Sequence, residues 1–423
     1  MRVIKKLLKA PFELLKKLIV TIQYIVSLIY IYQNKKKLKK KNKRLEKLNV
    51  VFIVQYIPGW NKLEPIYFKM KLDDRFNPII VCVPLNIKNS KLLNQDFSND
   101  TYDYFISKGC EAINALDENG EWFDIRNLSP DFVFHSRPYN SCMPQCFSSK
   151  EIRKYALLCN VLYGPNMTKN VREETLNFDY FSDVFCYFAF DDDEKDFYIH
   201  RFFVGTKCGI QKCYPYGATA LEQMLLCKKE REESSYVKTV FWTPRWSTDP
   251  NTGGSNFFRY VNTIKELVRL NPNVLFIIRP HPLMFENFVN TGEMSKKGVY
   301  LFKKYCETTN NVCLDESKEY LNNFWQSDIL ITDMSGIVPE YFITGKPIIY
   351  CHSTCNFIYD NSTSRMIDTL YAVNSSEELV NEFNHLICNE DEKRWRREEC
   401  IKNLFGDYKN NSENILGIMK DIR

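Results

Sequence analysis

The sequence VLFIIRPHP at residues 274–282 contains the clearest strand signal in the chain. Its five apolar residues, Val274–Ile278, are typical of a strand that is buried on both faces within a parallel sheet. Similar apolar runs occur at residues 50–54 and 329–332, and segments with helical periodicity separate them. This alternation of strands and helices predicts an α/β protein.

The strand signals form two series, separated by a stretch rich in glycine and without periodicity around Gly205–Gly217. A chain of 423 residues with 44% hydrophobic content is long enough for two such domains. We therefore predict two Rossmann-like domains, at residues 49–214 and 215–405, and a C-terminal tail at 406–423.

Residues 1–48 form a separate basic extension. The first 49 residues include fifteen Lys and Arg and two acidic residues, which gives this arm a net charge of +13. The whole chain has a net charge of +5, so the remainder is acidic. Apolar residues recur at helical spacing from Ile4 to Ile29, which predicts a basic amphipathic helix on an anionic membrane surface. The most apolar part, Leu18–Tyr32, is short for a membrane span. The alternative is a helix that packs on the body or forms a coiled coil.

These features predict a peripheral protein on the cytoplasmic face of the plasma membrane. Lysines rather than a small-residue cleavage site follow the apolar stretch, so we expect no export. The acidic body argues against a nucleic-acid partner. The fifteen cysteines show no metal-binding spacing and indicate reduced thiols, and we expect neither a metal site nor a cofactor.

In open α/β sheets, ligands bind beyond the carboxyl ends of the strands, so the residues that follow each strand are candidates for a binding site. The first such group follows the strand predicted at residues 239–242 and includes Thr243 and Arg245. A glycine-containing loop then leads through Ser255 and Asn256 into a helix. A helix start with small residues is suited to binding phosphate.

The second group is Arg279 and His281, directly after Val274–Ile278. Two prolines restrict this loop, and a rigid loop suits groups that must meet a phosphate or a moving proton. A local ion pair for Arg279 and a helix cap for His281 are the alternative interpretation.

The third group is Asp333, Ser335 and Gly336, with Glu340 about one turn later in a helix predicted at residues 335–343. The free N–H groups of a first helical turn can hold a diphosphate, and Glu340 can accept hydrogen bonds from ribose hydroxyls. Simple helix capping by Asp333 and Ser335 is the alternative.

Six strings in the chain point to a known family. They read IRPHP at 278–282, TDMSGIVPEYFITGKPIIY at 332–350, FWTPRW at 241–246 with GGSNFFRY at 253–260, and, in the first domain, WNKLEPIYFKM at 60–70 with PDFVFHSRPYN at 130–140. The chain resembles the CDP-glycerol glycerophosphotransferase family of teichoic-acid primases and polymerases, in a capsule-associated branch. The resemblance covers roughly residues 50–400.

The resemblance implies a two-domain GT-B architecture whose domains face a cleft, with the donor nucleotide in the C-terminal domain. It implies transfer of a polyol phosphate from a CDP-polyol to a hydroxyl of a lipid-linked or polysaccharide acceptor, with release of CMP. Arg279 and His281 would then contact the donor phosphates or the polyol, Asp333 and Ser335 would line the same pocket, and Glu340 would hold the ribose.

One departure from the family concerns the acceptor side. The polymerases carry a His-Gly-Thr-Pro motif there, whereas the comparable stretch of this chain is Leu162–Pro165. His135 follows a first-domain strand and is the best replacement base by position. The acidic run Asp191–Asp193 is expected to be a solvated turn rather than a metal site.

Two rival functions remain open. A Ser-Gly pair with a downstream Glu also suits a UDP-sugar, so a nucleotide-sugar-dependent glycosyltransferase or epimerase is the nearest alternative. The other is a non-catalytic scaffold of a polysaccharide assembly complex that has kept the fold.

Overall fold

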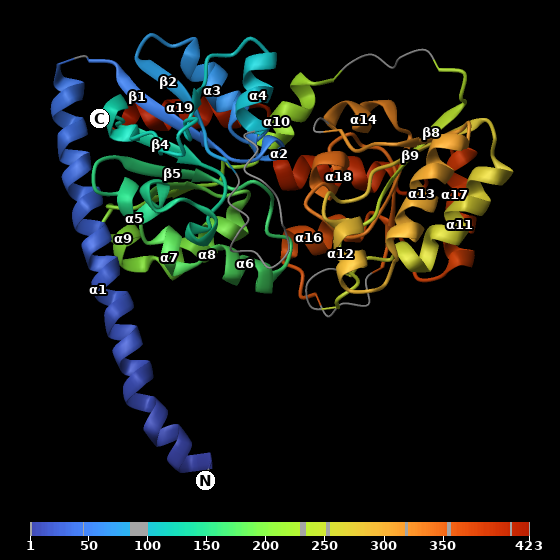
Figure 1. Ribbon diagram of the computed structural model, residues 1–423, viewed down its shortest axis with the longest axis horizontal. Helices are drawn as coiled ribbons and strands as arrows, with labels where there is room; N and C mark the ends of the chain where they lie inside the picture. Colours follow the sequence, from blue (N-terminus) through green and yellow to red (C-terminus); the bar gives the residue numbers. More distant parts are fainter. Residues whose placement is uncertain are drawn as a thin grey trace. The chain divides into compact units, whose positions relative to one another are not determined.

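The computed structural model describes residues 2–44, 46–84, 100–228, 234–250, 254–317, 320–352, 357–406 and 408–422 (Figure 1). The chain forms two compact units. Unit 1 comprises Met1–Tyr163, Arg172–Thr219 and Tyr408–Arg423, and unit 2 comprises Gly164–Val171 and Ala220–Asp407.

Unit 1 contains a parallel sheet of seven strands in the order β3-β2-β1-β4-β5-β6-β7. The strands are β1 Leu48–Val54, β2 Phe76–Cys82, β3 Ile113–Asn114, β4 Phe132–His135, β5 Leu157–Val161, β6 Val184–Phe188 and β7 Lys212–Tyr214. The helices are α1 Arg2–Lys43, α2 Ile57–Trp60, α3 Glu64–Lys71, α4 Asp100–Ser107, α5 Ser149–Ile152, α7 Phe178–Phe181, α8 Asp192–Arg201, α9 Phe203–Lys207 and α19 Asn411–Asp421, with 3-10 turns at Ile125–Leu128, Asn140–Cys142, Gln145–Phe147 and Tyr408–Asn410. Two helices, α6 Lys169–Thr175 and α10 Thr219–Leu226, include residues of both units.

Unit 2 contains a second parallel sheet, of six strands in the order β10-β9-β8-β11-β12-β13. The strands are β8 Lys238–Thr243, β9 Val274–Ile278, β10 Val312–Leu314, β11 Ile329–Thr332, β12 Ile348–Cys351 and β13 Tyr371–Val373. The helices are α11 Phe257–Leu270, α12 Met284–Asn290, α13 Lys296–Thr308, α14 Leu321–Gln326, α15 Val338–Phe342, α16 Asn361–Ile367, α17 Ser376–Ile387 and α18 Arg394–Phe405.

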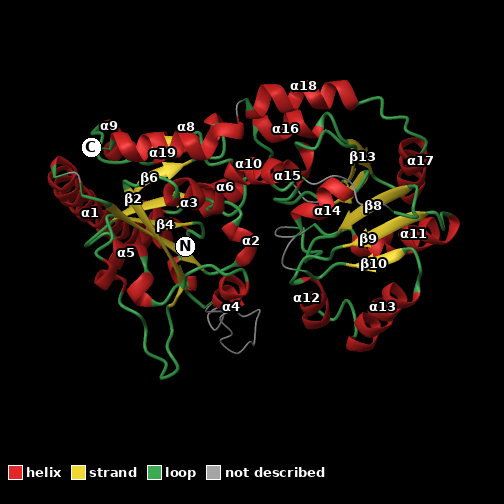
Figure 2. Ribbon diagram, turned by 90° about the horizontal axis from the view of Figure 1, so that it is seen from above, coloured by secondary structure: helices red, strands yellow, loops and turns green. Residues whose placement is uncertain are grey.

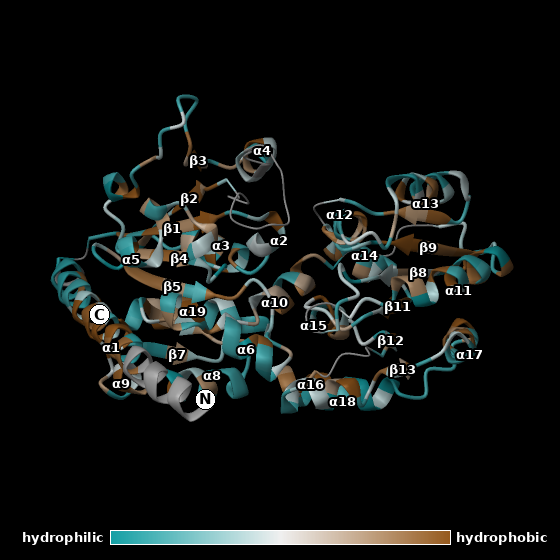
Figure 3. Cartoon of the chain, turned by 60° about the horizontal axis from the view of Figure 1, so that its bottom comes forward, coloured by the Kyte–Doolittle hydropathy of each residue, from teal (hydrophilic) through white to brown (hydrophobic). Residues whose placement is uncertain are grey.

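Helices lie on both sides of each sheet, as Figure 2 shows, and the strands are the most hydrophobic parts in Figure 3. The central strands are buried on both faces, since Val50–Ile53 and Ile329–Ile331 are almost fully inaccessible to solvent. The predicted fold class, with two Rossmann-like α/β units and an N-terminal helix, is confirmed.

The helix that follows Ser255 and Asn256 is α11, which begins at Phe257 with Asn256 in the N-cap position. The start of a second helix differs from the sequence-based expectation. α15 begins at Val338, so Ser335 and Gly336 lie in the preceding loop and not in a first helical turn. Pro339 in the first turn of α15 fits this later start, because proline is tolerated there and not further along a helix.

The second half of α1 packs on unit 1. The Tyr24 hydroxyl donates to Gln211 Oε1 at 2.7 Å, and the Ser27 hydroxyl donates to Asp183 Oδ1 at 2.7 Å. Asn34 Nδ2 donates to the Arg153 carbonyl at 2.8 Å. For this half, the alternative prediction of a helix packed on the body is correct.

The first half of α1 is different, because every side chain from Leu14 to Gln23 is exposed. An apolar stripe at helical spacing continues from it along the side turned away from unit 1, and consists of Leu15, Leu18, Ile22, Ile25, Ile29 and Tyr32. By length and composition alone, the segment Leu14–Lys41 could cross a membrane, which is weak evidence.

The C-terminal helix α19 returns to unit 1 and packs on α3 (Figure 1). Ile415, Leu416 and Met419 enter the core beside β1, and Lys69 lies 3.0 Å from Glu413 at the rim. The tail that the sequence set apart is therefore a structural part of the N-terminal unit.

Candidate functional site

The predicted binding residues of unit 2 meet at the carboxyl edge of its sheet. β8 lies between β9 and β11, so the loops that follow these three strands are neighbours. The loop after β9 is tied to the loop after β8, since the His281 N–H donates to the Pro244 carbonyl at 3.1 Å. The rule that ligands bind beyond the carboxyl ends of strands selected these loops from the sequence, and the structure brings them together.

Asp333 joins three segments of this edge. Its carboxylate accepts from the Arg245 N–H at 2.9 Å and from Asn256 Nδ2 at 2.8 Å, with a longer bond from the Asn256 N–H at 3.2 Å. The side chain is buried, and burial raises the pKa of Asp333 to about 6, against these hydrogen bonds, which lower it. Asp333 is therefore a clamp that holds the β8 loop and the start of α11 against the β11 loop.

Two further contacts fix the same loops. The buried hydroxyls of Thr243 and Thr332 are hydrogen-bonded at 2.7 Å across the two neighbouring strands. Arg245 donates from Nη1 to the Met334 carbonyl at 2.8 Å. Arg245 thus crosses from the β8 loop to the β11 loop, where its positive charge lies beside Ser335 and Gly336.

Arg279 is held by a carboxylate of the next strand. Its Nη1 lies 2.7 Å from Asp315 Oδ2, and its Nη2 donates to the Ser317 carbonyl at 2.9 Å. The guanidinium also lies over the ring of Tyr320, 5.0 Å from its centroid. The Tyr320 hydroxyl in turn donates to Glu340 Oε2 at 2.7 Å. The local ion pair that was the alternative interpretation of Arg279 is present.

Glu340 is buried and its carboxylate is engaged by Tyr320. A ribose could reach this carboxylate only after a rearrangement of the Tyr320 side chain. Its predicted role as a ribose acceptor remains a proposal.

His281 is the exposed member of the group. Its Nδ1 accepts from the Leu283 N–H at 3.2 Å, which leaves Nε2 without a hydrogen-bond partner among the described residues. Desolvation in the loop, together with the charges of Arg245 and Arg279, lowers the pKa of His281. The ring is therefore neutral at pH 7, and its Nε2 can accept a proton or a hydrogen bond.

The loop between β11 and α15 presents two small residues. The Ser335 hydroxyl is enclosed and finds no partner in the part of unit 2 that the structure describes. Gly336 is exposed, and a Cβ atom there would meet only Pro165, at 3.9 Å. A hydroxyl that lacks a partner beside open backbone is suited to a ligand with acceptor atoms, such as a phosphate.

Asp315 and Tyr320 belong to this site and were not predicted. Asp315 directly follows β10, so the strand-end rule that found Arg279 also applies to it. The short run Val312–Leu314 gave too weak a strand signal for the rule to be used there.

His135 lies in unit 1, at the end of β4, and is 2% exposed. Its Nδ1 is 3.2 Å from the Tyr180 hydroxyl, and its Nε2 is buried without a hydrogen-bond partner among the described residues. Burial, and then the charge of Arg137, lowers the pKa of His135 to about 3. A ring this buried and this weakly basic is poorly suited to the predicted role of general base.

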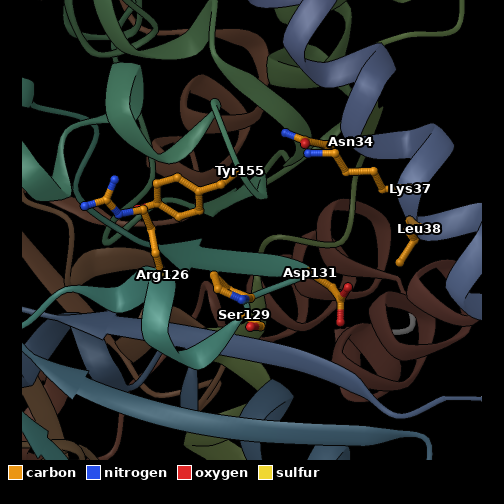
Figure 4. A pocket seen from close by; sticks show the side chains of 8 residues that line it. Asn34, Lys37, Leu38, Arg126, Ser129, Asp131 and Tyr155 are labelled. Atoms are coloured by element: carbon orange, nitrogen blue, oxygen red, sulfur yellow. The ribbon is translucent and has the colours of Figure 1, made fainter.

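A pocket of about 280 Å³ lies elsewhere in unit 1, between α1 and the segment before β4 (Figure 4). Its lining includes Asn34 and Lys37 of α1 together with Arg126 and Tyr155, and the Arg126 guanidinium points away from the α1 side chains. Arg126 is paired with Asp124 at 2.7 Å. The pocket is at the amino edge of the sheet and contains none of the predicted site residues.

No cluster of three or more His, Cys, Asp or Glu that could hold a metal ion occurs in the described ranges. The acidic run at 191–193 has a structural role, since the Asp191 side chain caps α8 by accepting from the Glu194 N–H at 2.8 Å.

The sequence of unit 2 matches a family model. Residues 228–417 match the model of the family described as CDP-glycerol:poly(glycerophosphate) glycerophosphotransferase. The match covers 190 of the 423 residues, and through it unit 2 is similar to that family. The resemblance and the enzyme class predicted from the motifs are confirmed, and the three loops at the carboxyl edge all lie within the matched residues. Among curated proteins, no relative matches the chain.

Solved structures share the fold at low sequence identity. A putative UDP-N-acetylglucosamine 2-epimerase from Listeria monocytogenes is 13% identical with a TM-score of 0.59, over 89% of this chain and 96% of that one. The UDP-GlcNAc 2-epimerase of Methanocaldococcus jannaschii in complex with UDP-GlcNAc and UDP is 16% identical with a TM-score of 0.56, over 88% of this chain and all of that one. A structure of the wall teichoic acid polymerase TagF is 13% identical with a TM-score of 0.49, over 96% of this chain and 98% of that one. The epimerase likenesses confirm the two-domain GT-B architecture and leave the activity to the family match.

Proposed function

We propose that this glycerophosphotransferase transfers a polyol phosphate from a CDP-activated donor to a hydroxyl group of a wall or capsular polymer or its lipid-linked precursor, and releases CMP. The observation that carries the proposal is the clamp at Asp333. It holds the loops that carry Arg245 and Ser335 together, and the bond from the His281 N–H to the Pro244 carbonyl ties a third loop to them. All three loops lie within the residues that match the family.

In the proposed reaction, the acceptor hydroxyl oxygen attacks the phosphorus that carries the polyol. The bond from this phosphorus to the bridging oxygen breaks, and CMP leaves with that oxygen. Little covalent work is asked of the protein, so positioning and neutralisation of charge supply most of the rate enhancement. Arg245 and the Ser335 hydroxyl are placed to hold the diphosphate, and the neutral His281 is placed to take the proton of the hydroxyl.

The test is a comparison of donors with the full-length protein. CDP-glycerol, CDP-ribitol and UDP-GlcNAc are incubated with the enzyme and a polyol phosphate acceptor, and free CMP and UDP are measured. We expect CMP from a CDP-polyol and no turnover of UDP-GlcNAc. Epimerisation of UDP-GlcNAc or release of UDP would contradict the proposal. The scaffold alternative predicts that His281→Ala leaves polymer synthesis intact in cells, while loss of residues 1–23 abolishes it.

We also propose that the enzyme associates peripherally with an anionic membrane through α1. The exposed stripe that includes Leu18, Ile22 and Ile25 has lysines on both sides of it in sequence, with Lys16 and Lys17 before and Lys36 after. Exposed apolar residues flanked by cations suit an anionic lipid surface. A coiled coil of two copies would bring these lysine-rich helices together with few acidic residues to compensate them.

The membrane proposal is tested by flotation with vesicles that contain phosphatidylglycerol. The double variant Ile22→Glu/Ile25→Glu should lose most of its binding, whereas Phe68→Glu, which changes an exposed apolar residue on α3, should bind like the wild type. Equal binding of all three proteins would contradict the proposal. If, without vesicles, the double variant had a lower molecular mass in solution than the wild type, the coiled coil would be favoured.

A further inference from the structure

The carboxyl edge of the unit 1 sheet contains an unusual group of buried polar atoms. Gln55 Oε1, His135 Nε2, Arg137 Nη1 and Asn160 Oδ1 are all enclosed and have no hydrogen-bond partner among the described residues. They lie at the ends of three adjacent strands, β1, β4 and β5. Buried polar atoms are normally paired, so four unpaired atoms in one place indicate a missing partner.

The strand register brings these residues together. Ile53 is level with His135, and His135 is level with Asn160. Because side chains alternate along a strand, Gln55 and Arg137 follow Ile53 and His135 on the same side of the sheet, one step nearer its edge. Arg137 lies two residues after His135, just beyond the end of β4, which places it at this edge.

Arg137 is the charged member, and its side chain has neither an ion pair nor a hydrogen bond among the described residues. Two other guanidinium groups with enclosed atoms are paired with carboxylates, whereas that of Arg201 lies over the rings of Phe178 and Phe197. Arg153 lies 2.6 Å from Asp183, and Arg279 lies 2.7 Å from Asp315. A guanidinium that is partly removed from water and left unpaired is unfavourable unless an anion completes it.

Two tyrosine hydroxyls lie at the same edge. The Tyr139 and Tyr163 hydroxyls are 3.3 Å apart, and the Tyr163 N–H is bonded to the Ser136 carbonyl next to Arg137. The Tyr163 side chain is partly exposed, and its hydroxyl is a hydrogen-bond donor that a ligand can reach. A guanidinium fork with neighbouring hydroxyl donors has the chemistry of a phosphate site.

We propose that Arg137, with the hydroxyls of Tyr139 and Tyr163, binds a phosphate group of the acceptor substrate. This inference rests on the proposed function, because it assigns the anion to the acceptor. The description of the matched family names a poly(glycerophosphate) acceptor, and the inference assigns residues of this chain to one phosphate of such an acceptor. It also gives unit 1 a specificity residue next to Leu162–Pro165, the stretch where the family motif is absent.

The first experiment measures direct binding to the full-length protein by calorimetry. The probes are glycerol 3-phosphate, glycerol and CDP, and the proteins are the wild type, Arg137→Gln, Arg137→Lys and the control Arg126→Gln, whose arginine is exposed and paired with Asp124. We expect glycerol 3-phosphate but not glycerol to bind. Arg137→Gln should weaken this binding at least tenfold and Arg137→Lys less, with CDP affinity unchanged in all four proteins.

The second measurement separates a ligand-binding arginine from a structural one. Because Arg137 has no protein partner, Arg137→Gln should unfold at the same or a higher temperature than the wild type without ligand, and should lose the stabilisation that glycerol 3-phosphate gives. In the transfer reaction, its KM for a polyol phosphate acceptor should rise at least tenfold, while its KM for the CDP-polyol stays unchanged.

Three results would overturn the inference. They are unchanged binding of glycerol 3-phosphate by Arg137→Gln, an equal loss of CDP affinity, which would assign the anion to the donor, and a clear fall in melting temperature. Failure of the proposed function gives a different pattern. In that case the wild type would not bind CDP, while glycerol 3-phosphate would still bind in a manner that depends on Arg137.

Discussion

The carboxyl edges of the two sheets are built from the same kind of loops but satisfy their polar groups differently. In unit 2, Asp333 and Arg279 are both bonded to protein partners, and the loops after neighbouring strands are tied together. In unit 1, the Arg137 side chain has no partner among the described residues, and neither has one buried atom in each of Gln55, His135 and Asn160. We interpret this difference as follows: the loops of unit 2 are already held in place before a ligand binds, whereas the polar atoms of unit 1 obtain their partners from the ligand.

The largest effect is expected at His281, the exposed group of the prearranged edge. His281→Ala should reduce kcat by about 10² to 10⁴, the usual contribution of a general base, and should leave CDP affinity within about threefold of the wild type. His200→Ala, which changes an exposed histidine on α8, is the matched control. Steady-state kinetics and CDP titration measure both quantities. A loss of CDP affinity as large as the loss of kcat would make His281 a binding group instead.

The sequence was sufficient for the elements and for the edge at which the site lies. Apolar runs such as Val274–Ile278 identify buried strands because a strand covered on both faces has no polar side. The rule for strand ends then selects Arg279, His281 and Asp333 without knowledge of their contacts. Strands and the residues that follow them could be predicted because each depends on a single segment of the sequence.

Partners could not be predicted in the same way. Nothing near Asp333 in the sequence shows that its carboxylate would bind Asn256, 77 residues away, rather than a ligand. The return of α19 to unit 1 depends on a tertiary core of the same kind. On α1, apolar residues lie on two sides of one helix, and only the packed structure shows that Tyr24 and Leu28 are buried while Ile22 and Ile25 are exposed.

The second largest effect tests whether the unit 2 loops are held by their clamp. Asp333→Ala removes a buried acceptor and leaves N–H groups of Arg245 and Asn256 without a partner, which should lower the free energy of unfolding by about 3 kcal/mol. CDP affinity should fall with it, because the loops that carry the ligand contacts separate. Urea unfolding and CDP titration check this, with Asp74→Ala at an exposed position as the control. If Asp333→Ala were as stable as the wild type, the contacts of Asp333 would not hold the unit 2 loops, and the difference drawn between the two edges would be wrong.

A smaller effect is expected from acid at the unit 1 edge. Burial lowers the pKa of His135 to about 3, below its ordinary 6.5, so below pH 6.5 the unfolded chain takes up a proton that the folded protein does not. The resulting stability is complete above pH 6.5 and is lost as the pH falls toward 3. At pH 5 the loss is about 2 kcal/mol for this group.

His135→Gln should therefore lose about 2 kcal/mol less than the wild type between pH 7.5 and pH 5, as measured by urea unfolding at both pH values. His385→Gln, at an exposed position on α17, should lose as much as the wild type. An identical pH dependence of wild type and His135→Gln would show that His135 becomes protonated in the folded protein, and would reopen its role as a base.

The smallest effect concerns Ser335. It is the predicted site residue of unit 2 that, like the residues at the unit 1 edge, has a buried polar atom without a partner among the described residues. Its hydroxyl has no partner among the described residues, so Ser335→Ala should leave the free energy of unfolding unchanged. If the hydroxyl donates to the diphosphate, CDP affinity should fall about tenfold, since a hydrogen bond to a charged group contributes about 1.5 kcal/mol. Thr243→Val is the matched opposite, because it breaks the 2.7 Å hydroxyl pair with Thr332 and should lower stability while CDP affinity is kept. Should both variants lose stability and affinity together, an unpaired polar group would no longer distinguish ligand-binding residues from structural ones, and the same reasoning would fail at Arg137.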